Sequence, residues 1–346
     1  MNIMKKSFKD ISWDVSEETY RKDTALSYST LARYEKTGFD GLKNLFDKID
    51  TPALTFGSAV DSIITGGEEE FNDRFMVAEF PNTPDSIIVI VREIFKLYKD
   101  NYNSLLDIPD SYILSVSNSH SYQLNWKPET RVKVIKEKGE AYYELLFLSE
   151  NKTILDTDTY KDVLNTVDAL KSSPATKWYF EKDNPFVNIE RLYQLKFKGE
   201  LDGIPFRNMA DLIIVDHDKK EVTPIDLKTS GKPEWNFYKS FIEWQYSIQA
   251  RLYWRIIRQN MDKDDYFKDF TLNDYKFIVV NRKTLTPLVW EYPDTQVLGT
   301  ITYNKDIVLR DPVVIGQELY NYLSNDYKTP IGIEEVNNIV EWLNKV

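Results

Sequence analysis

The chain of 346 residues contains no cysteine and only two histidines, His120 and His217. The absence of cysteine excludes disulfides, thiol nucleophiles, cysteine zinc sites and iron–sulfur clusters. The scarcity of histidine argues against a histidine dyad, a triad or a His-rich metal site. Any chemistry is therefore expected from carboxylates and lysines, with a hard cation as a natural companion.

Long apolar runs and a leader-like N-terminus are also missing. The run from Ile87 to Val91 is typical of this chain, whereas a membrane helix needs ~18 or more consecutive apolar residues. The segment Met1 to Lys6 is not followed by an apolar stretch and a small-residue cleavage site, so it does not fit a signal peptide. We expect a soluble, cytoplasmic protein with no membrane partner.

The composition is that of a globular protein with an acidic balance. Hydrophobic residues make up 42% and charged residues 29%, which excludes disorder for most of the chain. The 44 basic and 55 acidic residues give a formal charge of −11, which at first argues against a polyanionic partner. A locally basic groove can still bind a polyanion, and acidic residues can belong to a cation site, so net charge excludes little.

The first half of the chain is predicted to be helical around one irregular stretch. Ser27 is a candidate helix cap, and Asp156 can cap a helix over 157–172. Residues 80–130 contain four prolines around one helix-like segment, Ser86 to Asn101, which suggests an insertion or lid. We expect a single domain, 1–346, with a helical part at 1–79, this insertion or lid at 80–130, and the catalytic core with C-terminal strands and helices at 131–346.

The second half changes its period. Residues 187–229 alternate apolar and polar side chains, which predicts three or four antiparallel strands. One long amphipathic helix is predicted over 236–260, followed by strands at 275–281 and 287–292 and a helical remainder. The fold class is therefore α/β in the α+β sense: a mixed central sheet flanked by helices, with a helical N-terminal layer.

One predicted hairpin carries the candidate chemistry. Asp226 and Lys228 are two residues apart in a strand, so both project from one face. A turn around 218–219 would place Asp211 opposite Asp226, with β-carbons ~4.5 to 5.5 Å apart. Two facing carboxylates repel unless a cation lies between them, and oxygen ligands select Mg²⁺ or Mn²⁺.

Such a site suits phosphodiester hydrolysis. The metal would polarise a phosphoryl oxygen and activate a water, while the lysine orients that water or stabilises the charge of the transition state. The alternative is a surface hairpin with solvated charges, and a bare Asp-x-Lys is a weak motif on its own.

Asp211 followed by Ile225-Asp226-Leu227-Lys228-Thr229 resembles the signature of the PD-(D/E)XK nucleases. The resemblance implies a restriction-endonuclease-like core, with Asp211, Asp226 and the Leu227 carbonyl as metal ligands and Lys228 as the catalytic lysine. Thr229 is then a DNA contact.

The following helix contains a second match. Gln249 and Tyr253 resemble the Gln-x-x-x-Tyr motif of the RecB-like and exonuclease VIII-like branches, and Gln245 lies one turn earlier. In those branches such residues touch the DNA backbone or brace the active site. The alternative is a buried polar pair that packs the helix on the sheet.

Two further residues match with less agreement. Leu54 to Ile64 is similar to the family's Phe-Gly-Ser-Ala-Val-His helix, but Asp61 replaces the histidine and could serve as an oxygen ligand. Glu190 resembles the upstream glutamate that completes the catalytic set, or is an exposed strand carboxylate. Ser247 replaces a second family histidine. His217, in the presumed turn, is expected at the surface.

The resemblance implies a Mg²⁺-dependent DNA exonuclease, with Mn²⁺ as a substitute and no iron–sulfur cluster. The branch acts on double-stranded DNA ends in recombination or phage replication, often with a single-strand annealing recombinase and sometimes as a homo-oligomer, in a bacterial or phage-infected cell. Two alternatives stay open: a structure-specific or single-strand nuclease on the same fold, and a non-catalytic DNA-binding or assembly module.

Overall fold

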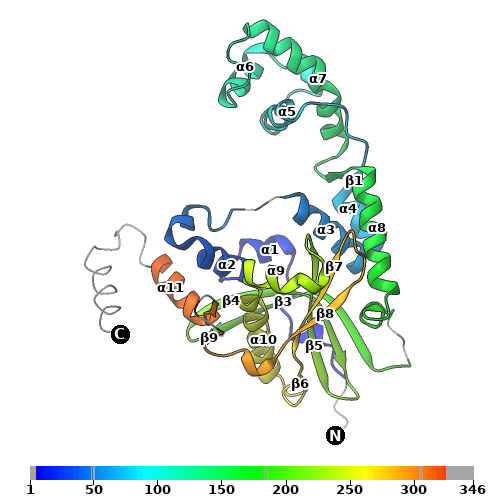
Figure 1. The fold of residues 1–346 in the computed structure, drawn as a ribbon, viewed down its shortest axis with the longest axis vertical. Coiled ribbons are helices and arrows are strands. Elements are labelled where there is room, and N and C mark those ends of the chain that lie inside the picture. The colour runs from blue at the N-terminus through cyan, green and yellow to red at the C-terminus, as the bar shows by residue number, and fades with distance from the viewer. Residues whose placement is uncertain are drawn as a thin grey trace, which may run out of the picture. The chain divides into compact units, whose positions relative to one another are not determined.

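The computed structural model describes residues 5–47, 49, 51–182, 184, 186–303, 305 and 307–324. The chain divides into two compact units (Figure 1). The sheet unit comprises Met1–Thr51 and Asp168–Val346, and the helical unit comprises Pro52–Val167. The segment outside the sheet unit is thus longer than the 80–130 insertion predicted from the prolines.

A mixed sheet forms the centre of the sheet unit. Its strands lie in the order β3-β4-β5-β7-β8, with short β6 beside β5. The β5 and β7 pair is parallel and β6 also runs parallel to β5, while the other neighbours are antiparallel. The bounds are β3 (Ile189–Leu201), β4 (Ile204–Asp216), β5 (Glu221–Ser230), β6 (Thr271–Leu272), β7 (Tyr275–Asn281) and β8 (Leu288–Tyr292). The mixed α/β fold class is confirmed, as are the strands predicted between 187 and 229 and at 275–292.

The crossover between parallel β5 and β7 is helical, as a parallel connection requires. It contains η5 (Glu234–Asn236), α9 (Phe237–Glu243) and α10 (Tyr246–Asp262). The prediction of one continuous helix over 236–260 is wrong, because Gln245 adopts a left-handed conformation with φ 55°. The carbonyl of Trp244 at this break accepts a hydrogen bond from the Tyr28 hydroxyl at 2.7 Å instead of continuing the helix.

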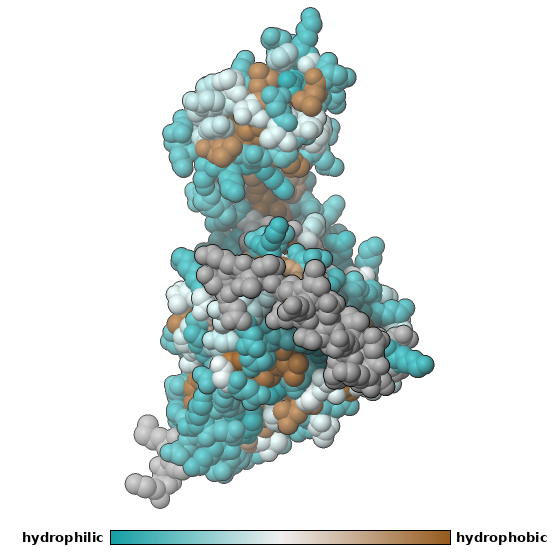
Figure 2. All heavy atoms as spheres, turned by 90° about the vertical axis from the view of Figure 1, so that its left-hand side faces the viewer, coloured by the Kyte–Doolittle hydropathy of each residue, from teal (hydrophilic) through white to brown (hydrophobic). Residues whose placement is uncertain are grey.

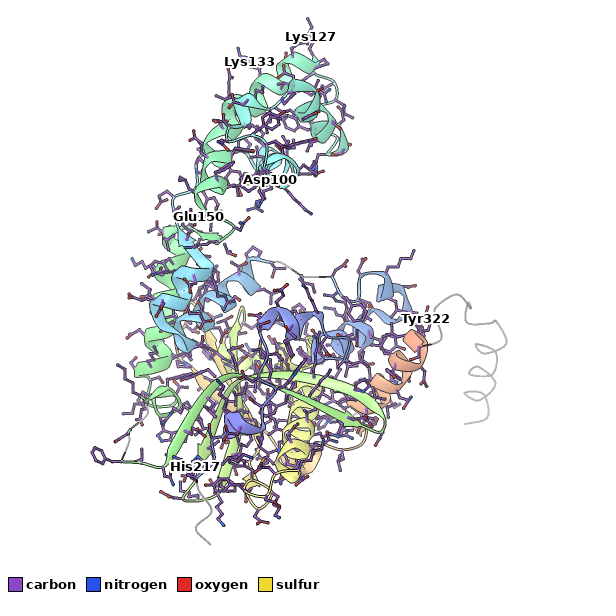
Figure 3. The ribbon with its side chains drawn as sticks, turned by 180° about the vertical axis from the view of Figure 1, so that it is seen from behind. Asp100, Lys127, Lys133, Glu150, His217 and Tyr322 are labelled. Carbon is purple, nitrogen blue, oxygen red and sulfur yellow. The ribbon has the colours of Figure 1, made fainter. Side chains whose placement is uncertain are left out.

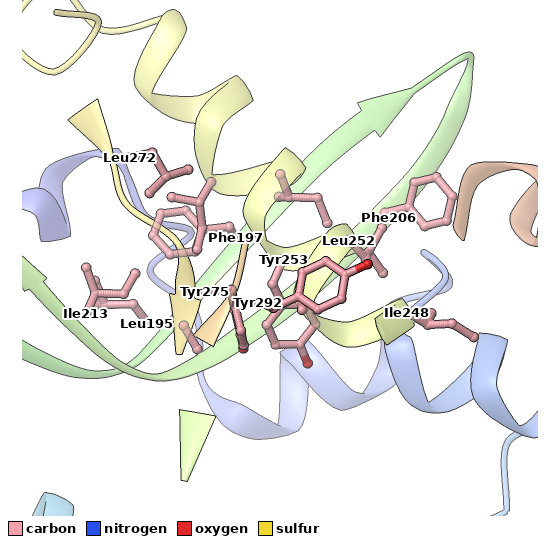
Figure 4. Close-up of a cluster of buried hydrophobic side chains, with 14 of the residues drawn as sticks. Leu195, Phe197, Phe206, Ile213, Ile248, Leu252, Tyr253, Leu272, Tyr275 and Tyr292 are labelled. Carbon is pink, nitrogen blue, oxygen red and sulfur yellow. The ribbon is translucent and has the colours of Figure 1, made fainter. Parts of the chain in front are cut away.

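The largest core of the sheet unit lies between α10 and the sheet. Ile248, Leu252 and Ile256 of α10 are buried against Phe197, Phe206 and Ile213 of the strands (Figure 4). The N-terminal and C-terminal elements complete this unit. They are η1 (Phe8–Ile11), α1 (Glu17–Lys22), α2 (Tyr28–Thr37), η2 (Gly38–Asn44), η4 (Lys177–Phe180), η6 (Asp294–Gln296), β9 (Ile301–Thr302), β10 (Val308–Leu309) and α11 (Pro312–Ser324). The remainder after 292 is therefore not helical throughout, since β9 and β10 form a small antiparallel pair.

The helical unit has its own apolar core. Ile90, Val91 and Ile94 of α5 pack with Ile135 and Tyr143 of α7 in one buried cluster. Residues 80–130 are more regular than predicted, because α6 and the start of α7 lie within them. The bounds are α3 (Pro52–Thr65), α4 (Gly67–Arg74), β1 (Phe75–Val77), α5 (Asp85–Tyr98), η3 (Leu105–Asp107), α6 (Asp110–Ser119), α7 (Pro128–Leu148), β2 (Thr153–Leu155) and α8 (Thr157–Ser172), the last of which continues into the sheet unit.

One helix start agrees with its sequence signal in full, and a second agrees in position only. Asp156 caps α8, since its Oδ1 accepts a hydrogen bond from the Thr159 amide at 2.7 Å. Ser27 precedes α2, although its hydroxyl lies near the hydroxyls of Ser29 and Thr30 and does not cap a backbone amide. No helix among the described residues is long and apolar enough to span a bilayer. Figure 2 shows mostly hydrophilic residues on the face that it presents, with hydrophobic patches between them.

Candidate active site

The hairpin of β4 and β5 brings the predicted carboxylates to neighbouring strands. Its turn comprises residues 217–220, and the ladder pairs Leu212 with Ile225. This register would place Asp211 opposite Asp226, as predicted. The Asp211 carboxylate accepts a hydrogen bond from the Leu227 amide at 2.9 Å, so the Asp211 side chain contacts the backbone of β5 one residue after Asp226.

Asp226 is the most buried of the candidate acids, with 2% of its surface exposed. Its Oδ1 accepts a hydrogen bond from the Gln249 side-chain amide on α10. Its Oδ2 lies 2.6 Å from Lys228 Nζ, yet no described residue gives this oxygen a well-directed hydrogen bond. A buried anionic oxygen in this state is suited to a positively charged partner.

Lys228 supplies the positive charge of the group. Its Nζ also lies 4.6 Å from the centre of the Tyr246 ring. Burial lowers the pKa of Lys228, but the neighbouring Asp226, together with Tyr246 and Asp211, outweighs burial and raises the pKa above its ordinary value. The raised pKa favours the ammonium form of Lys228, which can stabilise negative charge.

The oxygen atoms at this place fit a hard divalent cation. Asp211 and Asp226 provide two carboxylates, and the Leu227 carbonyl is a third candidate oxygen. Among the described residues, no group of three or more acidic or histidine side chains is arranged to hold a metal ion, so a cation would have to complete its coordination with water and backbone oxygen. Mg²⁺ commonly binds in this way, through one or two carboxylates and several waters.

Glu190 does not belong to this group, contrary to the prediction. It pairs with Val215 in the β3–β4 ladder, and four residues of strand separate Val215 from Asp211, which is roughly 13 Å. Its carboxylate accepts hydrogen bonds from the Ser7 hydroxyl at 2.6 Å and the Phe8 amide at 3.1 Å. Glu190 therefore anchors the N-terminal segment to the sheet.

His217 is not a surface residue, although it is the first residue of the β4–β5 turn (Figure 3). It is 6% exposed and lies among the rings of Tyr266, Phe267 and Phe270. Its Nε2 is 3.5 Å from the Glu190 carboxylate. The prediction was wrong because residues 264–270, which follow α10, pack over this turn. Local sequence does not reveal such a contact.

The helix residues predicted to contact DNA point inward. Gln249 is 3% exposed and Tyr253 is 7% exposed, with its ring 6.2 Å from that of Tyr275. Burial raises the pKa of Tyr253 well above its ordinary value. Gln249 can therefore brace Asp226, as the resemblance implies, while the burial of both side chains also agrees with a polar pair that packs the helix on the sheet. Gln245 is half-buried at the break before α10, and Thr229 is half-buried opposite Val280.

Asp61 lies on α3 in the helical unit and is half-buried. Its role as an auxiliary metal ligand stays a prediction based on resemblance.

The sequence did not predict that the Tyr246 ring lies beside Lys228, or that a residue opposite Asp211 has a left-handed backbone. Gln194 on β3 lies between the pairs Tyr193–Leu212 and Leu195–Ala210, across from Asp211, and has a φ of 54°. Positive φ at a residue other than glycine is uncommon and often marks a functional region. Nothing in the local sequence signals it.

Comparisons with known proteins give limited information. A scan of protein-family models finds no match, and a search of curated protein sequences finds none either. Among solved structures, the chain is similar to a protein of Eubacterium rectale that is provisionally called an exonuclease. The identity is 12%, the match covers 94% of both chains, and the TM-score is 0.46.

Proposed function

We propose that this protein is a metal-dependent nuclease that hydrolyses phosphodiester bonds in DNA, and that it acts as an exonuclease of the PD-(D/E)XK type. The observation that supports this proposal is the joining of Asp211, Asp226 and Lys228 on two adjacent strands, with Asp226 buried and held by Gln249. A buried acid with a lysine partner on one sheet face is the arrangement that the sequence resemblance requires.

Each residue has a role that follows from its charge and position. Asp211, Asp226 and the Leu227 carbonyl would hold Mg²⁺ or Mn²⁺, which when bound supplies Lewis-acid activation of the phosphoryl group and of water. Lys228 would stabilise the negative charge that grows on the phosphoryl oxygens as water attacks phosphorus. Gln249 would keep the Asp226 carboxylate in one orientation.

The test uses DNA of defined ends. Linear duplex, linear single-stranded and circular duplex DNA, labelled at either terminus, are incubated with the full chain in Mg²⁺, in Mn²⁺ and in EDTA. We expect release of short products from linear DNA with either metal and none in EDTA. Release from circular DNA would instead indicate an endonuclease, and preference for single strands or junctions would favour the first alternative function.

The chain offers a matched control for the site variants. Asp226→Asn and Lys228→Met alter a buried ion pair, whereas Asp265→Asn and Lys268→Met alter an exposed pair of 2.8 Å in the same unit. We expect the first two variants to lose cleavage by at least about a hundredfold, while both controls keep it. Wild-type DNA binding without cleavage by any form of the protein would favour the non-catalytic alternative.

The wider setting is part of the same proposal. A single-strand annealing recombinase as partner, a homo-oligomer, and action in the cytoplasm of a bacterial or phage-infected cell follow from the resemblance alone. Size-exclusion chromatography with light scattering, with and without DNA, tests the oligomer.

A further inference from the structure

A row of exposed apolar side chains lies on the helical crossover that follows the site strand. Trp235, Tyr238 and Ile242 are three and four residues apart, so they share one side of η5 and α9. Their exposed fractions are 56%, 49% and 36%. We call these three residues the Trp235 row. Single exposed apolar residues are common, but three adjacent ones with two aromatic rings indicate a contact surface.

Lysines flank the Trp235 row. Lys239 is exposed, and its Nζ lies 5.7 Å from the centre of the Tyr238 ring. On the neighbouring side of α9, Glu243 pairs with Lys232, and the pKa of Glu243 is lowered first by that hydrogen bond and further by Lys36. Lys232 and Lys36 thus both act on Glu243, and Lys239 adds an exposed positive charge beside the Trp235 row in a chain of net charge −11.

A third exposed aromatic ring lies at the helix break directly after α9. Trp244 is 48% exposed, and Lys36 Nζ lies 4.5 Å from the centre of its ring. Exposed aromatic rings with ammonium groups beside them suit a single-stranded nucleic acid, because bases can stack on the rings and phosphates can pair with the lysines.

Hydrogen bonds hold the backbone at the start of the Trp235 row. Glu234, directly before Trp235, is fully buried, and its carboxylate accepts hydrogen bonds from the amides of Asn281 and Thr286 at 3.0 and 3.1 Å. The Glu234 carbonyl accepts a further one from the Trp290 indole at 3.1 Å. A surface held in this way loses little conformational freedom when a ligand binds.

The buried side of α9 connects the row to the candidate site. Phe237 is 1% exposed and stacks on Tyr246 with ring centres 5.6 Å apart. The Tyr246 ring in turn lies 4.6 Å from Lys228 Nζ. A DNA strand bound on the outer side of α9 would therefore be separated from Lys228 by α9 and the Tyr246 ring.

We propose that the Trp235 row, with Lys239 and the Trp244–Lys36 pair, binds an unpaired stretch of DNA by base stacking and phosphate contacts. This inference rests on the proposed nuclease function for the identity of the nucleic acid. It adds a place for an unpaired strand that the metal-site residues do not provide.

Binding is measured by fluorescence anisotropy in EDTA, so that cleavage does not enter. The probes are a labelled oligothymidine and a blunt duplex of equal length. We expect Trp235→Ala with Tyr238→Ala to weaken oligothymidine binding by at least about tenfold, and the blunt duplex less, because each stacked base contributes roughly a 5- to 150-fold change. Trp235→Phe with Tyr238→Phe keeps the rings and should retain most of the affinity.

Two controls separate stacking from loss of fold and from charge. Trp126→Ala removes an exposed tryptophan of the helical unit, 38% exposed, and should leave binding unchanged. Lys239→Met should reduce the slope of log affinity against log salt by roughly 0.7, as expected for one lost phosphate contact with a single strand.

The outcomes decide between occupants. Unchanged oligothymidine binding by the alanine double variant overturns the inference, as does an equal loss for the blunt duplex. If the double variant keeps its affinity for oligothymidine but loses self-association in sedimentation, the row binds a second copy of this chain and the inference is wrong. Failure of the cleavage test with loss of oligothymidine binding in the double variant would refute the nuclease proposal but support this surface.

Discussion

Glu234 provides the most direct test of how the crossover beside the candidate site is held. Its buried carboxylate accepts hydrogen bonds from two backbone amides, Asn281 and Thr286, and from the hydroxyls of Thr284 and Thr286 at 2.6 and 3.2 Å. Glu234→Ala removes all four acceptor contacts. Asn281 pairs with Ser230 at the end of β5, so the substitution also loosens the strand that carries Lys228.

The size of the effect follows from these contacts. A hydrogen bond to a charged group is worth about 1.5–3 kcal/mol, and an unpaired buried amide costs about 1–3 kcal/mol. Because the contacts are not additive, we expect Glu234→Ala to lower the free energy of unfolding by about 3–5 kcal/mol. Glu234→Gln keeps the shape and one acceptor oxygen, and should lower the free energy of unfolding by about 1–2 kcal/mol.

The effect should depend on pH with a defined sign. Burial raises the pKa of Glu234, but the hydrogen bonds from Thr284 and from the Asn281 and Thr286 amides outweigh burial and lower it below its ordinary value. A lowered folded-state pKa stabilises the protein above the unfolded pKa of about 4.3, and this stabilisation is lost as the pH falls through the folded pKa. The difference between wild type and Glu234→Gln should therefore be present at pH 7 and shrink below about pH 4.

The assay is urea unfolding of the full chain followed by tryptophan fluorescence. Of the eight tryptophans in the sequence, only Trp126 lies between residues 52 and 167, so the signal reports mainly on the sheet unit. The reasoning is refuted if Glu234→Ala changes the free energy of unfolding by less than about 0.5 kcal/mol, the usual range for a surface substitution. A Glu234→Gln difference that is equal at pH 7 and pH 3.5 would refute the electrostatic part.

Three further predictions concern the site and the helical unit. Gln249→Leu should retain the fold but lower metal-dependent cleavage by roughly 10- to 100-fold, measured as product release at several Mn²⁺ concentrations. An unchanged rate would show that the hydrogen bond from Gln249 is not needed to orient Asp226. Asp61→Asn should weaken Mn²⁺ binding in calorimetry if Asp61 is a ligand, and equal affinity removes it from the proposed set. Gly139→Val should destabilise the helical unit by about 1–3 kcal/mol in thermal unfolding, because a Cβ there would lie 2.7 Å from Val91 Cγ2 and 2.9 Å from Leu105 Cδ2. A melting temperature equal to that of wild type would contradict the tight packing.

Local patterns predicted the elements whose signals are complete within a short segment. The alternation in 187–229 predicted the strands, and a turn at 218–219 predicted the β4–β5 register correctly, since the side-chain period of a strand permits few alternatives. Asp156 predicted the start of α8 for the same reason, because a helix cap bonds only to its own first turn.

The break between α9 and α10 was not predictable in this way. The apolar spacing of 236–260 continues across it, and the Trp244 carbonyl at the break accepts a hydrogen bond from Tyr28, which comes from a distant part of the chain. The regularity of 80–130 was underestimated because prolines were interpreted as irregular structure, although Pro84, Pro109 and Pro128 all lie at helix starts, where proline is tolerated.

The residue inventory directed attention to carboxylates and lysines, because the chain has no cysteine and only two histidines. The choice of Asp211, Asp226 and Lys228 among them came from the hairpin spacing and the family resemblance. Only the tertiary structure separated the carboxylates that meet from those that do not. Glu190 and Asp211 lie on neighbouring strands, but the β3–β4 register turns Glu190 toward the N-terminal segment. The same packing made Gln249 and Tyr253 interior residues, and it left Trp235 and Tyr238 at the surface. Burial depends on what long-range packing brings to each side chain, and this information is distributed over the whole chain.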